Sequence, residues 1–213
     1  MSIATLVLGQ SGTGKTASLR NLDPAQTALI KAVEKPLSFR ATGWNQYTTD
    51  SWEQMIKAAR KAVGNGKTVV VIDDFQYVMA NEFMRRSDEK GFDKFTEIAR
   101  HAWEVISALS SLPENVRVYI LSHTQDDDYG RTKIKTIGKM LDEKITLEGL
   151  FTMVLRTQVQ DGAYQFRTAN NGSDTVKAPM GMFDDEIIEN DLAAVDQAVC
   201  EYYGINQQQE QTA

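Results

Sequence analysis

Eight consecutive residues near the N-terminus combine three glycines with a lysine and a threonine, a set that suits phosphate binding. They match the pattern G-x-x-x-x-G-K-[ST] at every position and read Gly9-Gln10-Ser11-Gly12-Thr13-Gly14-Lys15-Thr16. Glycines allow a tight turn in which successive backbone N–H groups point toward phosphate oxygens. We therefore expect Lys15 to reach the β- and γ-phosphates of a nucleotide, and the Thr16 hydroxyl to hold Mg²⁺.

The segments on either side of these residues fit a phosphate-binding loop. The apolar run 3–8 predicts a buried strand before the loop, and a short helix is expected after it, ending near Asp23-Pro24. The start of a helix adds the positive end of its dipole. The alternative is a glycine-rich turn with a coincidental Lys-Thr pair. Such a turn does not explain why a strand precedes these residues and a helix follows them. The predicted nucleotide-binding residues are Gly9, Gln10, Ser11, Gly12, Thr13, Gly14, Lys15, Thr16 and Ala17.

A second site for the metal ion follows an apolar segment in the middle of the chain. Residues 68–72 predict a buried strand, and Asp73 and Asp74 come directly after it. Ligands of open α/β sheets bind at the carboxyl ends of the strands. Asp73 is therefore expected to hold Mg²⁺ through water, which makes Thr16 and Asp73 the predicted metal site.

The motifs favour adenine over guanine as the base. The chain has no Asn-Lys-x-Asp motif, and Asp73 is not followed by the Asp-x-x-Gly pattern of a GTPase. The predicted cofactors are therefore ATP and Mg²⁺. Hydrolysis also needs a carboxylate that activates water. Glu34, just after the apolar run 27–33, and Asp74 are the two candidates, and both stay open.

Strand and helix patterns alternate along most of the chain. We expect strands at 27–33, 68–72 and 116–121, and helices at 52–63, 75–86, 92–109 and 191–203. Ser51 and Gln54 have the spacing of a capping box at the first of these helices. This alternation predicts βαβ crossovers and a mainly parallel sheet. Residues 151–159 and 163–168, joined by Asp161-Gly162, predict an antiparallel hairpin.

Length and composition limit the class of protein. The 213 residues suit one domain, which we place at 1–204, followed by a polar tail at 205–213 that we expect to be disordered. A single cysteine, Cys200, excludes an internal disulfide and favours the cytoplasm. The chain has no basic leader before an apolar run and no stretch of about 20 apolar residues, so neither a signal peptide nor a membrane span is expected.

Charge is unevenly distributed. The net charge is −6, but residues 178–213 contain eight acids and neither lysine nor arginine. An acidic protein normally lacks a broad nucleic-acid surface. Because the acids gather at one end, residues 1–177 retain room for a local basic patch.

Four positions in this order resemble the core of RecA-like ATPases. They are the phosphate loop, Glu34 past the second strand, Asp73 past the third, and the polar pair Ser122-His123 past the fourth. The chain is also similar to phage-encoded P-loop nucleotide-binding proteins and to short RecA-core single-strand annealing proteins. The segments 164–167 and 176–183 add to this likeness, which covers about residues 3–203. The resemblance implies an α/β, RecA-like P-loop NTPase core with a mainly parallel sheet, flanking helices and a C-terminal hairpin.

The resemblance also implies catalytic roles for Glu34, Lys15, Asp74 and His123. Glu34 matches the glutamate that activates water, although Lys35-Pro36 follows it where such proteins often have glycine. Ser122-His123 matches the pair that senses the γ-phosphate, with histidine in place of the usual glutamine. A loop histidine with a purely structural role is the alternative for His123. His101, inside a predicted helix, is interpreted as structural.

Two further groups of cations follow from the resemblance. In RecA-like proteins the loop after the sensor strand contacts single-stranded DNA, and here that loop carries Arg131, Lys133, Lys135 and Lys139. A solvated surface loop is the alternative. RecA-like sites are also usually completed by a cation from a neighbouring subunit. Lys177 and Arg167 are the candidates for this finger.

The expected function is Mg²⁺-dependent ATP hydrolysis coupled to single-stranded DNA in phage recombination or replication. The expected partners are further copies of the chain in a ring or filament, single-stranded DNA, and phage replication or recombination proteins. A phage protein would act in the host cytoplasm. There are two alternatives. One is a helicase loader or other motor-type ATPase with a protein partner, and the other is a nucleotide-gated binding module with little turnover.

Overall fold

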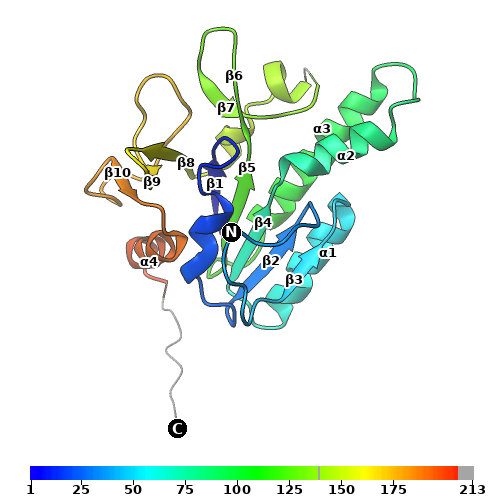
Figure 1. Ribbon diagram of the computed structural model, residues 1–213. Coiled ribbons are helices and arrows are strands. Elements are labelled where there is room, and N and C mark those ends of the chain that lie inside the picture. Colours follow the sequence, from blue (N-terminus) through cyan, green and yellow to red (C-terminus); the bar gives the residue numbers. More distant parts are fainter. Residues whose placement is uncertain (139, 206–213) are drawn as a thin grey trace.

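An eight-stranded sheet in the order β10-β9-β8-β1-β5-β4-β2-β3 forms the centre of the molecule (Figure 1). The computed structural model describes residues 1–138 and 140–205, with the backbone alone for Asp142. Lys139 and residues 206–213 of the expected tail lie outside the described residues. The strands are β1 (Ile3–Leu8), β2 (Thr27–Lys31), β3 (Gln46–Thr48), β4 (Val69–Asp73), β5 (Arg117–Ser122), β8 (Met153–Gln160), β9 (Ala163–Arg167) and β10 (Ile187–Glu189).

The six strands from β8 to β3 in this order run parallel to one another. β9 pairs antiparallel with β8 across a turn at Asp161 and Gly162, both with positive φ, and β10 pairs antiparallel with β9. The mostly parallel α/β arrangement is therefore confirmed. β5 lies between β1 and β4, so its last residue, Ser122, ends between the strands that lead into the phosphate loop and Asp73.

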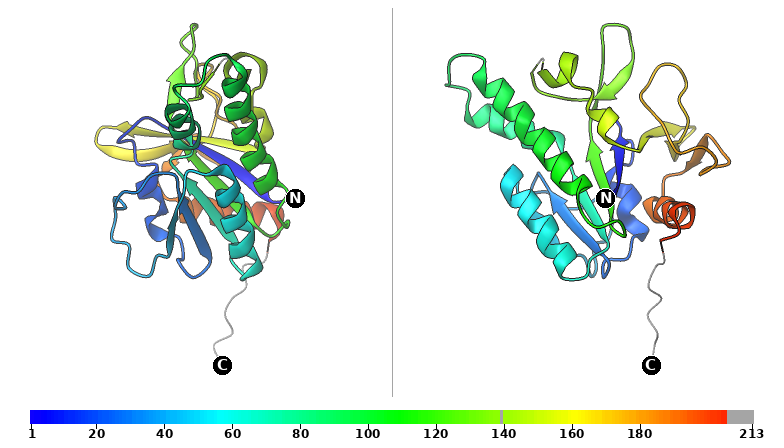
Figure 2. Two further views of the ribbon diagram at one scale, coloured as in Figure 1. Left: turned by 90° about the vertical axis from the view of Figure 1, so that its right-hand side faces the viewer. Right: turned by 180° about the vertical axis from the view of Figure 1, so that it is seen from behind.

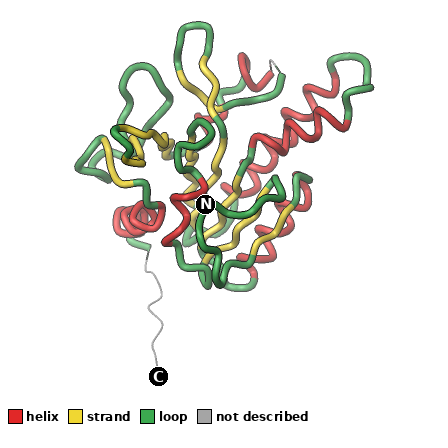
Figure 3. Tube along the Cα trace, in the orientation of Figure 1, coloured by secondary structure: helices red, strands yellow, loops and turns green. Residues whose placement is uncertain are grey.

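Helices cover both faces of the sheet (Figure 3). The helices α1 (Trp52–Gly64), α2 (Gln76–Arg85) and α3 (Asp93–Ser110) lie on one side, as the two views of Figure 2 also show. The 3₁₀ helix η1 (Thr16–Asn21) and α4 (Leu192–Tyr203) lie on the other. β4 shows why two layers form: Val70 and Ile72 join the core under α1–α3, whereas Val69 and Val71 join the core under η1 and α4.

Local sequence signals explain where the helices begin and end. The Ser51 hydroxyl accepts a hydrogen bond from the N–H of Gln54 at the start of α1, as its spacing predicts. α4 begins after Asp191, whose carboxylate accepts from the N–H of Ala193, and ends at Gly204 with a φ of 64°. Within the described residues, no helix is both long and apolar enough to cross a bilayer.

The short helix expected after the phosphate loop is the six-residue 3₁₀ helix η1, which ends before Asp23-Pro24. The expected dipole is correspondingly small. The short edge strand β3 has no apolar pattern, and it forms by pairing with β2.

A small antiparallel pair follows β5 and projects beyond the sheet. β6 (Thr124–Asp126) and β7 (Thr132–Ile134) form a two-stranded sheet at the top of Figure 1. The π-helical turn Met140–Lys144 and the 3₁₀ helix Leu147–Leu150 then lead back to β8. The connection between α2 and α3 projects from the same end of the molecule.

Candidate active site

The glycine-rich loop leaves β1 at the carboxyl end of the parallel strands and leads into η1. Gly12 and Gly14 have φ values of 80° and 95°, which favour glycine over residues with a Cβ. Gly9 has a different reason to be glycine, because an added Cβ would lie 1.9 Å from the Thr157 hydroxyl. Backbone conformation thus explains why Gly12 and Gly14 are glycines, and close packing explains why Gly9 is one.

Lys15 is buried within this loop. Its ammonium donates hydrogen bonds to the carbonyls of Gly9 and Gln10, both at 2.8 Å, and only 6% of the residue is exposed. Burial lowers the pKa of Lys15 to about 8, although the nearby carboxylates of Asp74 and Asp73 act in the opposite direction. The loop therefore holds a desolvated cation, which interacts more strongly with an anion than a solvated lysine does.

Thr16 and Asp73 meet across the carboxyl ends of the strands. The Thr16 hydroxyl donates to the two carboxylate oxygens of Asp73, at 3.0 and 3.2 Å. Burial, followed by the neighbouring carboxylate of Asp74, raises the pKa of Asp73. The pair is an all-oxygen donor set beside a phosphate-binding loop, which fits Mg²⁺.

The described residues contain no cluster of three His, Cys, Asp or Glu side chains that could hold a metal. Mg²⁺ in nucleotide sites is held by one or two protein oxygens together with phosphate oxygens and water, so a pair such as Thr16 and Asp73 is sufficient.

Asp74 occupies an unusual position beside Asp73. Its φ is 60°, a conformation that few residues other than glycine adopt, and the residue is 3% exposed. Its carboxylate forms an ion pair with Lys35 and lies 3.6 Å from His123 Nε2. Burial alone would raise the pKa of Asp74, but His123 and Lys35 lower it below its usual value. This carboxylate is thus held in its charged form by two partners.

β5 ends at Ser122, between the strands that lead into the phosphate loop and Asp73, and His123 follows directly. The N–H of Gly9 donates to the Ser122 carbonyl at 3.3 Å. The Ser122 hydroxyl is buried and has no hydrogen-bond partner among the described residues. The carbonyl of His123 accepts from the N–H of Lys135 at 2.8 Å, which joins His123 to the β6–β7 pair.

Glu34 differs from Asp74 in its surroundings. β2 ends with Lys31 paired to Asp73, so Glu34 follows at the same edge of the sheet. Its side chain is exposed and makes no hydrogen bond or ion pair within the described part of the chain. Glu34 is therefore the unengaged carboxylate of the two candidates.

Three residues that were not predicted as site residues contact the phosphate loop from β8, β9 and the position after β10. The Thr157 hydroxyl lies 2.6 Å from that of Thr13 and 3.2 Å from the Leu8 carbonyl. Tyr164 and Asn190 lie against Gly14. These three residues follow the loop by more than 140 positions, and no local pattern marks them.

The proposed finger residues lie in the same late region. Lys177 is exposed, and its backbone forms hydrogen bonds in both directions with Val154. The Arg167 guanidinium lies 4.0 Å from Glu186. Neither side chain makes a described hydrogen bond or ion pair with the phosphate loop.

The predicted DNA-binding residues belong to the β6–β7 hairpin and the segment after it. Arg131 and Lys135 are exposed, Lys133 is partly exposed, and Lys139 lies outside the described residues. The acidic stretch before them has a local role, because the Asp127 carboxylate accepts from the N–H groups of Tyr129 and Arg131 at the turn. These hydrogen bonds, with the one from Arg131 the largest, lower the pKa of Asp127.

His101 has the structural role expected of it. Its ring stacks on Trp52 with centroids 4.7 Å apart, and Nδ1 lies 2.9 Å from the Glu82 carboxylate. The histidine therefore joins α3 to α1 and α2.

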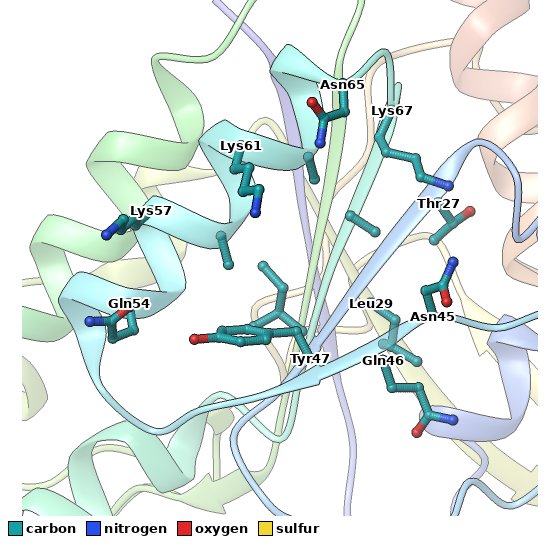
Figure 4. A pocket seen from close by; sticks show the side chains of 14 residues that line it. Thr27, Leu29, Asn45, Gln46, Tyr47, Gln54, Lys57, Lys61, Asn65 and Lys67 are labelled. Atoms are coloured by element: carbon teal, nitrogen blue, oxygen red, sulfur yellow. The ribbon is translucent and has the colours of Figure 1, made fainter.

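A cavity of about 470 Å³ lies between α1 and the strands β2 and β3 (Figure 4). Tyr47 and the lysines Lys57, Lys61 and Lys67 contribute to its lining. Lys67 is engaged, because its ammonium donates to the Pro24 carbonyl at 3.0 Å. None of the predicted site residues lines this cavity, so it is separate from the phosphate loop.

Comparison with known proteins agrees with this arrangement. The family described as an AAA domain matches residues 1–179, which is most of the chain. No curated protein matches the sequence. The matched region contains the phosphate loop, Asp73 and the end of β5, but it ends before β10 and α4. The chain therefore belongs to this AAA domain family and is a nucleotide-binding domain of ATPase type.

Proposed function

We propose that this domain binds and hydrolyses MgATP as a RecA-like ATPase, and that it acts on single-stranded DNA in phage recombination or replication. The observation that carries the proposal is the direct connection between the site and the hairpin. Ser122 and His123 lie beside the phosphate loop and Asp74, and β6 begins at Thr124, immediately after them. A change in the contacts of Ser122 and His123 at the γ-phosphate would therefore be passed directly to β6 and its basic surface.

The phosphate loop supplies the nucleotide contacts. Backbone N–H groups from Gly9 to Ala17 bind the phosphates, and Lys15 leaves the carbonyls of Gly9 and Gln10 to contact the β- and γ-phosphates. Thr16 and Asp73 would hold Mg²⁺, which supplies positive charge that neutralises the phosphates. The buried Ser122 hydroxyl, without a partner among the described residues, would hydrogen-bond the terminal phosphate.

Glu34 is our proposed general base. A general base must accept a proton, and Glu34 is exposed and unengaged within the described chain. Asp74 is a poorer acceptor because Lys35 and His123 lower its pKa. We assign Asp74 to positioning His123, which then hydrogen-bonds the γ-phosphate. Asp74 as the base remains the alternative.

The β6–β7 hairpin is the proposed DNA-binding surface. Arg131, Lys133 and Lys135 supply positive charge, and Tyr129 at the turn is 96% exposed. Cations that follow a nucleic-acid backbone, combined with exposed aromatic rings on which bases stack, are the usual features of proteins that bind single strands. Lys139 extends the same basic segment in the sequence.

A homo-oligomer, as a ring or filament, fits this small surface. One hairpin offers few phosphate contacts, whereas repeated hairpins raise the effective concentration of binding sites along a strand. Lys177 is exposed and has no side-chain partner among the described residues, so it is the first candidate for a finger that reaches the neighbouring subunit's nucleotide. Arg167 is the second.

One observation favours a protein partner instead, as in a helicase loader. Met84 and Phe92 are 66% and 85% exposed around the connection between α2 and α3. Where exposed apolar side chains form one contiguous patch, they mark a protein-contact site. Phage replication or recombination proteins are the partners that this alternative implies.

The proposal is tested by ATP turnover with and without a single-stranded oligonucleotide. We expect DNA to stimulate turnover and its binding to weaken steeply as salt rises. The double variant Lys133→Ala/Lys135→Ala should lose this stimulation and keep basal turnover. Lys57→Ala/Lys61→Ala on α1 removes the same charge at exposed sites far from the hairpin and serves as the control. Turnover that is insensitive to DNA, with no measurable DNA binding, would exclude the DNA role.

A further inference from the structure

The phosphate loop has two different flanks. On one side of β1 lie β5 and then β4, which carry Ser122 and Asp73. On the other side lie β8, β9 and β10. Asp73, the expected metal ligand, and Ser122 lie on the β5–β4 side, which favours this side for the terminal phosphate of a nucleotide. The β8–β10 side is then the flank expected to meet the nucleoside at the opposite end of the same molecule.

Tyr164 and Asn190 form the wall of the loop on this second flank. A Cβ added to Gly14 would lie 2.9 Å from Tyr164 Cδ1 and 3.0 Å from Asn190 Oδ1. Both side chains therefore touch the last glycine of the loop, directly before Lys15. The N–H of Asn190 donates to the Tyr164 carbonyl at 3.2 Å, so the two residues are also held together.

The Tyr164 ring is exposed on the surface of the β8–β9 hairpin. Its cross-strand neighbour is Val159, and the two residues are 50% and 45% exposed. Residues two apart share a face of a strand, so Tyr164 lies on the same face as the buried Phe166. Phe166 is paired with Thr157, which contacts Thr13 of the loop. The hairpin thus directs Tyr164 to the face that the phosphate loop occupies.

Asn190 contributes an unused hydrogen-bond donor. The residue is only 2% exposed, and its Nδ2 has no hydrogen-bond partner among the described residues. Its carbonyl accepts from the guanidinium of Arg20, which also forms an ion pair with Glu189 at 3.0 Å. A buried amide held in place without a partner is unfavourable unless a ligand satisfies it.

We propose that Tyr164 and Asn190 form the nucleoside subsite of this domain. The base stacks on the Tyr164 ring, and the Asn190 carboxamide, whose Oδ1 is its atom nearest to Gly14, hydrogen-bonds the nucleoside. This inference rests on the proposed nucleotide-binding function. It adds the residues that recognise the nucleoside part of the nucleotide. Asn190 lies beyond the matched region 1–179, so the subsite combines a residue of that region with one outside it.

The test compares ATP with tripolyphosphate, both with Mg²⁺, by calorimetric titration. Tripolyphosphate shares the phosphate contacts and lacks the nucleoside. We expect Tyr164→Ala to weaken ATP binding about tenfold or more, in line with the loss of one stacked base, and to leave tripolyphosphate binding unchanged. Tyr164→Phe keeps the ring and should retain ATP affinity. Asn190→Ala should also weaken ATP selectively.

Tyr47→Ala is the matched control, because Tyr47 is 46% exposed and belongs to the distant edge strand β3. Equal weakening of both ligands by Tyr164→Ala would mean that Tyr164 only supports the loop through Gly14, and would overturn the subsite. Unchanged ATP binding in Tyr164→Ala would overturn it as well. Failure of the wild-type protein to bind either ligand would instead overturn the proposed nucleotide-binding function, and the subsite with it.

Discussion

The hydroxyl of Thr16 lies 3.0 Å from a carboxylate oxygen of Asp73, although 57 positions separate the two residues in the chain. Thr16 follows β1 and Asp73 ends β4, with β5 inserted between these strands. The two oxygen groups nevertheless converge because all three strands end at one edge of the parallel sheet. This contact joins the phosphate loop to the predicted metal site.

The first prediction concerns nucleotide affinity. Lys15→Ala removes the one cation that the loop encloses, and we expect ATP affinity to fall at least 100-fold, because charge-assisted contacts with two phosphates are lost. Titration calorimetry measures the affinity, and circular dichroism checks the fold. The control is Lys57→Ala, which replaces an exposed lysine on α1. A folded Lys15→Ala protein with wild-type ATP affinity would exclude the loop as the binding site.

The second prediction concerns stability and pH. Burial lowers the pKa of Lys15 to about 8 from a value of 10.5, so between these pH values the unfolded chain binds more protons than the folded one. The free energy of unfolding should therefore rise with pH in this window, by about 3 kcal/mol in total. Lys15→Met lacks this contribution. Denaturant unfolding at pH 7.5 and 10 should show that the free energy of unfolding of the wild type rises relative to that of Lys15→Met. If the difference between the two proteins were the same at both pH values, the burial of Lys15 would be contradicted.

The third prediction concerns the packing of the loop. Gly9→Ala places a Cβ against Thr157, so the loop must shift and ATP affinity should fall about tenfold or more. Adding Thr157→Ala removes the hydroxyl at 1.9 Å and should restore part of the affinity. Gly64→Ala, at a helical position with no atom within 4 Å of its Cβ, should leave binding unchanged and stabilise α1 by about 0.5–1 kcal/mol. Equal affinities for all variants would refute the close contact.

The fourth prediction separates binding from hydrolysis. Glu34→Gln keeps the shape of the side chain and removes the base, so we expect unchanged ATP affinity and a turnover lower by about 100-fold or more. Asp74→Asn weakens the ion pair with Lys35 and the placement of His123, so its turnover should fall less. Steady-state phosphate release measures both. If Asp74→Asn alone abolished turnover, Asp74 would be the base, and the helicase-loader alternative would gain support.

The fifth prediction concerns the attachment of α4 to the sheet. The Arg117 guanidinium donates two hydrogen bonds of 2.9 Å to Asp196, and the Tyr119 hydroxyl donates a third at 2.7 Å. Asp196→Ala leaves Arg117 buried without its partner, so the free energy of unfolding should fall by about 3–5 kcal/mol. Urea unfolding measures this change.

The double variant Arg117→Met/Asp196→Leu is the control for that loss, because it removes both charges together. It should be clearly more stable than Asp196→Ala. The opposite order would show that the ion pair itself, rather than the unpaired charge, dominates the stability of this contact.

The longer strands and helices are predictable from the amino-acid sequence, because their signals are local. The apolar run 3–8 gives β1 with the predicted bounds, and Ser51, Asp191 and Gly204 mark helix ends where the structure has them. Alternation of strands with helices was sufficient to predict a mostly parallel sheet. The glycine and lysine spacing of the phosphate loop is likewise contained in eight consecutive residues.

The distant side chains that surround that loop are brought there by strand pairing, which the sequence does not reveal. Tyr164 and Asn190 reach Gly14 because β8 pairs with β1 and carries β9 and β10 beside it, and no residue near them in the chain signals that pairing. In the sequence Lys35 departs from the family pattern, whereas in the structure it is the ion-pair partner of Asp74. Pairing and charge contacts of this kind depend on strand order and burial, which are properties of the whole fold, so a local pattern cannot reveal them.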